Sequence, residues 1–567
     1  MTALPAKRRR PPLELIPEIA RAAASRLAAP LRTAWRRNWF YRRLLKGRLS
    51  DRILFHPYDA LPRKLEDADA LLRGRFRFNG DTVDVEEGSV FDKEPPGAVW
   101  RDALHSFDWL PPLAAAGGEP ARTLATNLIG QWVKRYPRYS EPEWSPEVMA
   151  RRLVHLFVHG RFVIPNSDVL WRSKLFVSLR EQSRQLARIA AKARDGFPRF
   201  EAAAALALSG ACLDDSPKRL LQGLERLEEE IGRQILPDGG YADRSPETLL
   251  HAYRHIVMVM DALTAIDHPI PGALLSAHDR MAPMLRFFRH GDGALALFNG
   301  GHECDRRTIA GLLARDDVRG APFAFAPHSK FQRLAAVKAY AVMDCGPVPE
   351  GVYASGAHAG CLSFEFSAGG QRLVVNCGSA SRWDGALRAT AAHSTVTLAD
   401  TSMASVLSPG IARDLVGARM IGGPLEVSSE RRETPHGWRV EARHDAYLRK
   451  FGVMHERHLT LAPDGSILTG ADMLTPRSQR GAGVPFAVRF HIHPDVRITR
   501  AQSGDFLLKL PSGEGWRFRA GAEVAVEESV YAGAGLAVRK TEQLVLSGAV
   551  KGEPLEIAWV FERIGVS

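Results

Sequence analysis

The sequence predicts an α+β fold in which a helical part precedes an antiparallel β-sandwich. From about residue 96 to about residue 290, apolar residues recur every three or four positions, as at Leu221, Leu224 and Leu227. This is the period of helices with one buried face. After about residue 330 the period falls to two, and Gly, Pro and Asp turns separate short apolar segments. The 567 residues exceed the roughly 250 to 300 that one hydrophobic core supports, so we expect two large domains.

Helix starts are marked by serine–proline pairs. Ser145, Ser216 and Ser245 each precede a proline. Serine is a common N-cap residue, and proline is tolerated at the first helical position because its missing N–H needs no partner there. The short links between these segments predict helical hairpins arranged in a bundle or a ring. Two pairs of histidines four residues apart, His155 with His159 and His251 with His255, each fall on one face of a predicted helix.

Two turns are also predicted. The segment GRFRFNGDTVDVEEG, residues 74–88, indicates one hairpin ahead of the helices, and Pro463-Asp464-Gly465 indicates a hairpin turn between two later strands.

The first fifty residues form a basic, partly amphipathic arm. The chain has a net charge of +12 and a pI near 9.6, and a large share of the excess lies in this arm. Charge of this sign favours an anionic partner, but nucleic acid is not favoured because no recognised nucleic-acid module accompanies it. Residues 13–45 carry aromatic side chains among the arginines. Either they pack on their own domain or they contact a membrane surface.

We expect a cytoplasmic protein, peripheral to the membrane if this arm binds lipid. The apolar stretch after the basic start is interrupted by charges, unlike a signal peptide. No apolar run reaches the roughly 20 residues that a spanning helix needs.

Residues 355–400 carry polar side chains at the ends of alternating strands. His358, Asn376 and His393 stand at such ends. Polar residues at recurring strand ends are candidates for a site.

A set of motifs in a fixed order resembles the heparinase II/III-like family. The motifs are PDGGYADRSPE at 237–247, FRHGDGALALFNGG at 288–301, AHAG at 357–360, NCG at 376–378, AHST at 392–395, HDAY at 444–447 and FHIHP at 490–494. The resemblance covers about residues 50–560 and implies an incomplete (α/α) toroid followed by an antiparallel β-sandwich. On this basis we expect three parts: the arm at 1–50, a toroid at 51–330 and a sandwich at 331–567.

The resemblance also implies a polysaccharide lyase. Such enzymes cleave acidic, uronic-acid-containing chains such as glycosaminoglycans by β-elimination, in the cleft between toroid and sandwich. The reaction needs a group that neutralises the C5 carboxylate, a base for the C5 proton and an acid for the departing O4.

This chain departs from the family pattern at three expected catalytic positions. An Asn–His pair before an alanine-rich helix is replaced within residues 196–200, a tyrosine is replaced near Glu247 and Thr248, and a histidine is replaced by Gly356. The remaining candidates for base or acid are Tyr241, His251 and Tyr253 with His393 on the sandwich side, and the candidates for carboxylate binding are Arg199 and Arg244.

Some members of the family hold zinc in the sandwich, and the matching residues here are His358, Asn376 and His393. Imidazoles suit zinc, whereas a neutral amide is a poor ligand. The trio therefore either binds zinc with help from His491 or Asp400, or forms a hydrogen-bonded structural cluster.

The substituted positions leave a second function open. The chain is either a lyase or a non-catalytic or differently catalytic glycan-binding protein that serves polysaccharide assembly or export.

Overall fold

The structure is a computed structural model that describes residues 15–61, 65–165, 168–315, 322–380, 383–533 and 537–565. The chain forms two compact units. The helical unit comprises Ala23–Ile235 and His251–Asp279, and the sandwich unit comprises Met1–Ala22, Leu236–Leu250 and Arg280–Ser567. Three helices, α1 (Ile16–Leu27), α12 (Pro246–Ala265) and α13 (Gly272–Phe287), have residues in both units.

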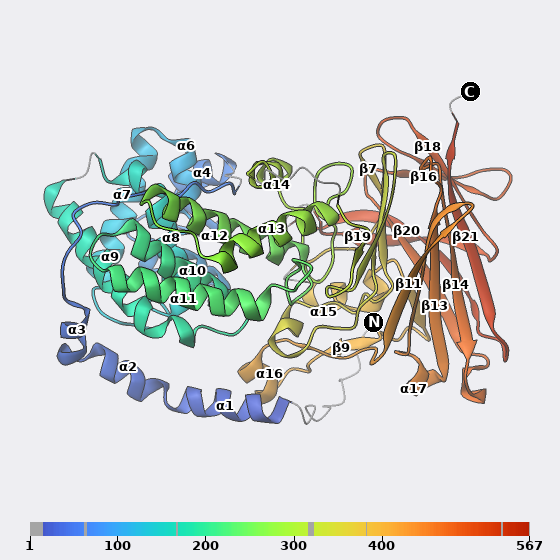
Figure 1. The fold of residues 1–567 in the computed structure, drawn as a ribbon, viewed down its shortest axis with the longest axis horizontal. Coiled ribbons are helices and arrows are strands. Elements are labelled where there is room, and N and C mark those ends of the chain that lie inside the picture. Colours follow the sequence, from blue (N-terminus) through green and yellow to red (C-terminus); the bar gives the residue numbers. More distant parts are fainter. Residues whose placement is uncertain are drawn as a thin grey trace. The chain divides into compact units, whose positions relative to one another are not determined.

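The helical unit is built from consecutive helices that pack on their sequence neighbours (Figure 1). Its further elements are α2 (Ala29–Arg37), α3 (Trp39–Leu45), α4 (Leu65–Leu72), β1 (Arg75–Phe78), β2 (Asp81–Asp84), α5 (Ala98–His105), α6 (Leu110–Ala116), α7 (Gly118–Arg135), α8 (Pro146–Val163), α9 (Val169–Ile189), α10 (Phe197–Cys212) and α11 (Pro217–Gln234). β1 and β2 form the hairpin predicted at residues 74–88.

Helix α10 is the most buried helix of this core. Its alanine-rich sequence buries twelve of sixteen residues, because small side chains let neighbouring helices approach closely. Gly223 of α11 shows how closely: a Cβ there would lie 2.4 Å from the backbone nitrogen of Ala207. Any larger residue at this position would push α10 and α11 apart.

The serine–proline pairs do start helices, but two of the serines do not cap them. Pro146 and Pro217 occupy first positions of α8 and α11, as predicted. Neither Ser145 nor Ser216 makes a side-chain hydrogen bond to its helix. The fixed φ of proline, rather than a serine cap, marks these starts.

The sandwich unit contains two large antiparallel sheets. One has the order β11-β12-β13-β14-β21-β18-β17-β16, and the other has the order β19-β20-β15-β7-β6-β5-β4-β3, with β8 paired to β15. The strands are β3 (Phe325–Ala326), β4 (Phe331–Ala336), β5 (Ala339–Asp344), β6 (Phe364–Ala368), β7 (Gln371–Val375), β8 (Val396–Leu398), β11 (Val427–Thr434), β12 (Gly437–His444), β13 (Val453–Leu461), β14 (Ile467–Pro476), β15 (Pro485–Ile492), β16 (Arg497–Arg500), β17 (Phe506–Lys509), β18 (Gly515–Ala520), β19 (Val524–Tyr531), β20 (Arg539–Ala549) and β21 (Leu555–Ile564).

Shorter elements connect these sheets and complete the chain. They are α14 (Arg306–Leu313), α15 (Asp384–Leu387), α16 (Ile411–Val416), α17 (Leu448–Phe451), β9 (Ala404–Val406) and β10 (Met420–Gly422), with β9 and β10 paired to each other. The turn predicted at Pro463-Asp464-Gly465 lies between β13 and β14, where Gly465 has a φ of +71° that favours glycine.

Aromatic side chains join the two sheets. Phe364 of β6 stacks on Trp559 of β21 with ring centroids 5.4 Å apart, and Phe490 of β15 contacts the same tryptophan edge-on. β13 and β21 alternate buried and less buried residues, so every second side chain enters the core. β6, which carries Phe364, is buried along its whole length, and β5 and β7 are buried along most of theirs. The period of two therefore corresponds to one buried face in the first sheet, whereas the middle of the second sheet is buried on both faces.

A charged cluster is also buried in this core. Asp472 of β14 accepts hydrogen bonds from His455 Nε2 at 2.8 Å, Arg457 Nε at 2.8 Å and Trp559 Nε1 at 3.0 Å. Arg457 Nη1 donates to the carbonyl oxygens of Leu362 and Ser394. The guanidinium thereby links β13 to segments beside the other sheet.

The N-terminal arm exposes apolar and aromatic side chains. α1 has no buried residue, and Leu27, Leu31, Trp35, Trp39 and Phe40 are all more than half exposed. Within the described residues, none of the helices has the length and apolar character that crossing a bilayer requires.

Candidate functional site

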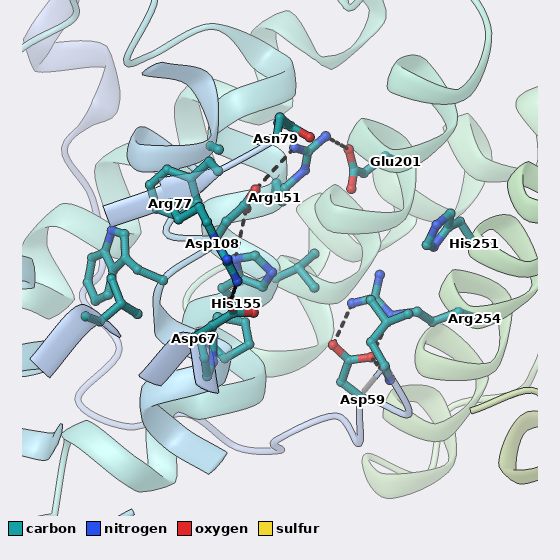
Figure 2. Close-up of a pocket in the computed structure, with 18 of the residues that line it drawn as sticks. Asp59, Asp67, Arg77, Asn79, Asp108, Arg151, His155, Glu201, His251 and Arg254 are labelled. Carbon is teal, nitrogen blue, oxygen red and sulfur yellow. Dashed lines mark hydrogen bonds and ion pairs between the residues drawn. The ribbon is translucent and has the colours of Figure 1, made fainter. Parts of the chain in front are cut away.

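A cavity of about 560 Å³ opens in the helical unit (Figure 2). Its volume lies in the range of ligand pockets, roughly 300–1,000 Å³. Charged, histidine and aromatic side chains line it together, among them Asp59, Asp67, Arg75, Arg77, Phe78, Asp108, Trp109, Arg151, His155, Phe197, Glu201, His251, Arg254 and His255. Aromatic faces with convergent polar groups are typical of sites for polar ligands such as sugars.

Arg151 of α8 connects two acids across this pocket. Its guanidinium lies 3.5 Å from Glu201 Oε2 of α10 and 3.8 Å from Asp108 Oδ2 (Figure 2). Both contacts are long for hydrogen bonds, and the Arg151 side chain is 41% exposed. The guanidinium of Arg151 is therefore accessible to a further anion from the pocket.

Arg254 of α12, by contrast, is fully engaged with Asp59. Its Nε and Nη2 donate to the two carboxylate oxygens at 2.6 and 2.7 Å, and both side chains are almost buried. Burial raises the pKa of Asp59, but the charge and hydrogen bonds of Arg254 outweigh it, so the pKa lies below its usual value. This pair forms a fixed wall of the pocket.

His255 of α12 presents a neutral ring nitrogen. Its Nδ1 donates to the carbonyl oxygen of His251 at 2.8 Å, while its buried Nε2 has no hydrogen-bond partner among the described residues and lies 3.8 Å from Glu201 Oε1. Burial, followed by the charge of Arg254, lowers the pKa of His255 to about 4. His255 is thus an uncharged acceptor at neutral pH.

Asp108 differs from His255 because burial favours its protonated form. Burial raises the pKa of Asp108, although Arg151 and His155 oppose the shift, and in the described part of the chain its Oδ1 has no hydrogen-bond partner. Nearby, His155 Nδ1 donates to the carbonyl oxygen of Ser106 at 3.0 Å, and burial lowers the pKa of His155. The pocket therefore combines a carboxyl group that retains its proton more readily than usual with neutral imidazoles.

The residues predicted as base or acid occupy different settings. His251 lines the pocket, whereas Tyr253 is buried and its hydroxyl is 2.9 Å from His278 Nε2. Tyr241 is also buried and belongs to the sandwich unit. Among these three, His251 alone is a pocket residue, and catalytic roles for all of them remain predictions.

The two arginines predicted to bind a carboxylate hold local chain segments. Arg199 donates to the carbonyl oxygen of Ala193 at 3.0 and 3.2 Å and pairs with Asp195. Arg244 is buried, forms an ion pair with Asp344 and donates to the carbonyl oxygen of Ser329 at 2.9 Å. Their role in substrate binding stays a prediction.

The trio predicted to hold zinc is brought together in the sandwich unit. His358 Nδ1 and His393 Nε2 lie 3.1 Å apart, and His393 Nδ1 donates to the carbonyl oxygen of Ala389. The Asn376 amide donates to Leu297 O and accepts from Ser394 N. Burial lowers the pKa of His393 to about 4.

This donor set is a poor fit for a zinc ion because its third member is a neutral amide. The nitrogen and oxygen of that amide already bond to Leu297 O and Ser394 N. His358 Nδ1 and His393 Nε2 face each other at 3.1 Å, a separation that suits a shared proton as well as a shared metal ion. Of the two proposed helpers, His491 has oxygen partners on both ring nitrogens, and the Asp400 carboxylate points into solvent beside Arg489. Zinc binding by the trio stays a prediction, beside the structural cluster that the sequence left open.

A different set of donor atoms lies close together elsewhere in the sandwich unit. Glu441, Glu456 and His458 offer ligand atoms within 4.8 Å of one another, among the described residues. Arg439 lies 2.9 Å from Glu441 and 2.6 Å from His458, so a guanidinium already compensates this cluster.

Asp108, Glu201 and Arg151 were missed in the sequence because they lie in three separate segments with no motif among them. The spacings of His155 with His159 and of His251 with His255 were the available signals, since each placed two imidazoles on a single helix face, and His155, His251 and His255 line the pocket.

Comparisons with known proteins agree with the fold. A family model of the heparinase II/III-like C-terminal region matches residues 318–560. FtsZ-localized protein C of Caulobacter vibrioides (strain NA1000 / CB15N) is 33% identical over 511 residues, which cover 88% of each chain.

Two solved structures show the same architecture. Heparinase III matches with a TM-score of 0.71 at 14% identity, over 98% of this chain and 92% of that one. A mutant of heparan sulfate lyase HepC from Pedobacter heparinus matches with a TM-score of 0.60 at 16% identity, over 97% and 91%. Together they confirm the predicted toroid followed by a β-sandwich.

Proposed function

Because this chain belongs to the heparinase II/III-like family, we propose that it cleaves a uronic-acid-containing polysaccharide by β-elimination. The observation that supports the proposal is the grouping of Arg151, His255 and Asp108 around one cavity of the helical unit. These residues supply the group that neutralises the carboxylate, the base and the acid that the reaction needs. They stand at positions other than those used by the family. A site in the cleft between toroid and sandwich remains a prediction.

In the proposed reaction Arg151 pairs with the C5 carboxylate and makes the C5 proton more acidic. His255 Nε2 accepts that proton, the electron pair forms the C4–C5 double bond, and the C4–O4 bond breaks. Asp108 donates its proton to the departing O4. The roles of His255 and Asp108 use the charge state that burial favours for each group. For Arg151 the charge of Glu201 outweighs burial and raises the pKa, so the guanidinium stays charged.

An absorbance assay tests the proposal. The purified protein is incubated with a panel of uronate polysaccharides, and the unsaturated product is followed by its ultraviolet absorbance. We expect turnover on at least one polymer and its loss in Arg151→Gln. Arg226→Gln, which changes an exposed arginine on α11, is the matched control. Binding without product on every polymer would instead establish the glycan-binding alternative, and neither binding nor product would exclude both.

We infer a second function from the N-terminal arm: contact with a membrane surface at sites where FtsZ is present. The supporting observations are the five exposed apolar and aromatic side chains of α1–α3 and the similarity to FtsZ-localized protein C. Arginines between these side chains suit an anionic surface.

Vesicle sedimentation tests this second function. The protein should co-sediment with vesicles that contain anionic lipid and, in their presence, with FtsZ polymers. Trp35→Ala/Trp39→Ala should remain in the supernatant, while Trp383→Ala, which removes an exposed tryptophan of the sandwich unit, should still sediment. Unchanged sedimentation of the double variant would contradict the role of the arm.

A further inference from the structure

A second cavity, of about 550 Å³, lies in the helical unit between α7 and α9, and it shares no lining residue with the pocket described above. Its walls are mostly apolar: Ile129, Val133, Pro137, Trp144, Leu170, Trp171, Leu175 and Val177. We call it the α7–α9 groove. Leu170 is 70% exposed, so part of this apolar wall faces solvent.

One face of α9 lines the groove, with Leu170 and Lys174 exposed, Val177 half-buried and Glu181 buried. Leu170, Lys174, Val177 and Glu181 all line it, at spacings of four, three and four residues. This is the spacing of a single helical face. A face with apolar residues at such positions is one that a further helix can cover by packing its side chains between them.

The acids of the groove are already satisfied. Asp168 caps α9 and accepts the N–H groups of Leu170 and Trp171 at 2.9 and 3.0 Å. Glu181 lies 3.7 Å from Arg42 and 3.8 Å from Arg180. Two arginines therefore compensate Glu181. The charge of Asp168 is stabilised by the first N–H groups of α9, and within the described residues no cation pairs with it.

The lysines of the groove are not compensated. Lys134 of α7 and Lys174 of α9 are exposed, and neither forms an ion pair with any residue in the described part of the chain. The groove therefore offers an apolar floor with unpaired positive charge at its edge. Its charge favours an acidic occupant and disfavours a basic one.

We propose that the α7–α9 groove is a docking site for an acidic amphipathic helix of a partner protein. The apolar side of that helix covers Val133, Leu170 and Val177, and its carboxylates pair with Lys134 and Lys174. The proposal is independent of the proposed lyase activity, because the two cavities have no residue in common. The basic N-terminal arm of a second copy is a poor occupant for electrostatic reasons.

Fluorescence anisotropy with three labelled peptides tests the proposal. Each peptide has about 18 residues, or five helical turns, and the same leucine pattern at i, i+3, i+4 and i+7. The remaining positions are mainly Glu in the first peptide, Gln in the second and Lys in the third. We expect the Glu peptide to bind saturably and the Lys peptide not to bind. The Lys134→Glu/Lys174→Glu variant should bind the Glu peptide about tenfold more weakly, because two exposed positive charges are reversed. It should bind the Lys peptide instead.

The matched control is Lys192→Glu/Lys218→Glu, which makes the same charge change at exposed positions outside the groove and should leave binding unchanged. Val177→Asp should abolish binding of the Glu peptide, and circular dichroism establishes that each variant is folded. Equal binding of the three peptides, or equal weakening by both double variants, would overturn the proposal. The proposal would also be overturned if sedimentation equilibrium showed a dimer of the full chain and Val177→Asp dissociated that dimer.

Discussion

Replacing Asp472 with alanine should lower the free energy of unfolding of the sandwich unit by about 3–5 kcal/mol. The carboxylate is fully buried and accepts hydrogen bonds from His455, Arg457 and Trp559. Without it, Arg457 keeps its positive charge in the core with carbonyl oxygens as its remaining partners. The cost arises from this uncompensated charge rather than from lost packing.

Urea denaturation followed by tryptophan fluorescence measures the effect. Asp495→Ala removes a carboxylate that pairs with Arg539 at half-exposed positions, and this control should change stability by less than about 1 kcal/mol. Asp472→Ala/Arg457→Met should be more stable than Asp472→Ala alone, because it removes the unpaired charge. A double variant less stable than the single one would contradict this explanation.

Replacing His255 with leucine should reduce the rate of polysaccharide cleavage by a factor of about 10² to 10⁴, the usual contribution of a general base. Leucine retains volume but removes the Nε2 acceptor that faces the pocket. The loss should appear in kcat more than in KM, since the proton is transferred in the chemical step. His268→Leu, outside the pocket, should retain wild-type rates.

The pH profile provides a second test of the same residue. A base with a pKa of about 4 stays unprotonated down to about pH 5, so cleavage should persist there and fall as a proton occupies Nε2. On the alkaline side, cleavage should fall as Asp108 loses the proton that burial helps it retain. An acid limb near pH 6.5, the ordinary range of histidine, would contradict the assignment of His255.

Sequence reasoning succeeded where a signal is local. The change of period near residue 330 predicted the two kinds of structure, and Pro146, Pro217 and Gly465 lie where helix starts and a hairpin turn were expected. The order of motifs from residue 237 to 494 indicated the family. Each of these signals depends on neighbouring residues or on the order of segments, and both can be read directly from the sequence.

The sequence grouped His358, Asn376 and His393. In the structure the two imidazoles are in contact, and Asn376 accepts a hydrogen bond from the backbone N–H of Ser394, the residue after His393. It could not decide what they do, because that depends on which atoms are already bonded. The amide of Asn376 turns to backbone partners contributed by Leu297 and Ser394, and the two imidazoles bond to each other.

The sequence by itself thus determined the fold class, the family and the position of the polar cluster in the sandwich. The tertiary structure decided the pocket, because Asp108, Arg151, Glu201 and His255 come from segments far apart in the chain. It also decided their protonation, since the pKa shifts of Asp108 and His255 arise from burial. Periodicity indicates which residues are buried together on one element. The distances between elements, and how far each titratable atom is removed from solvent, are set only when the chain folds.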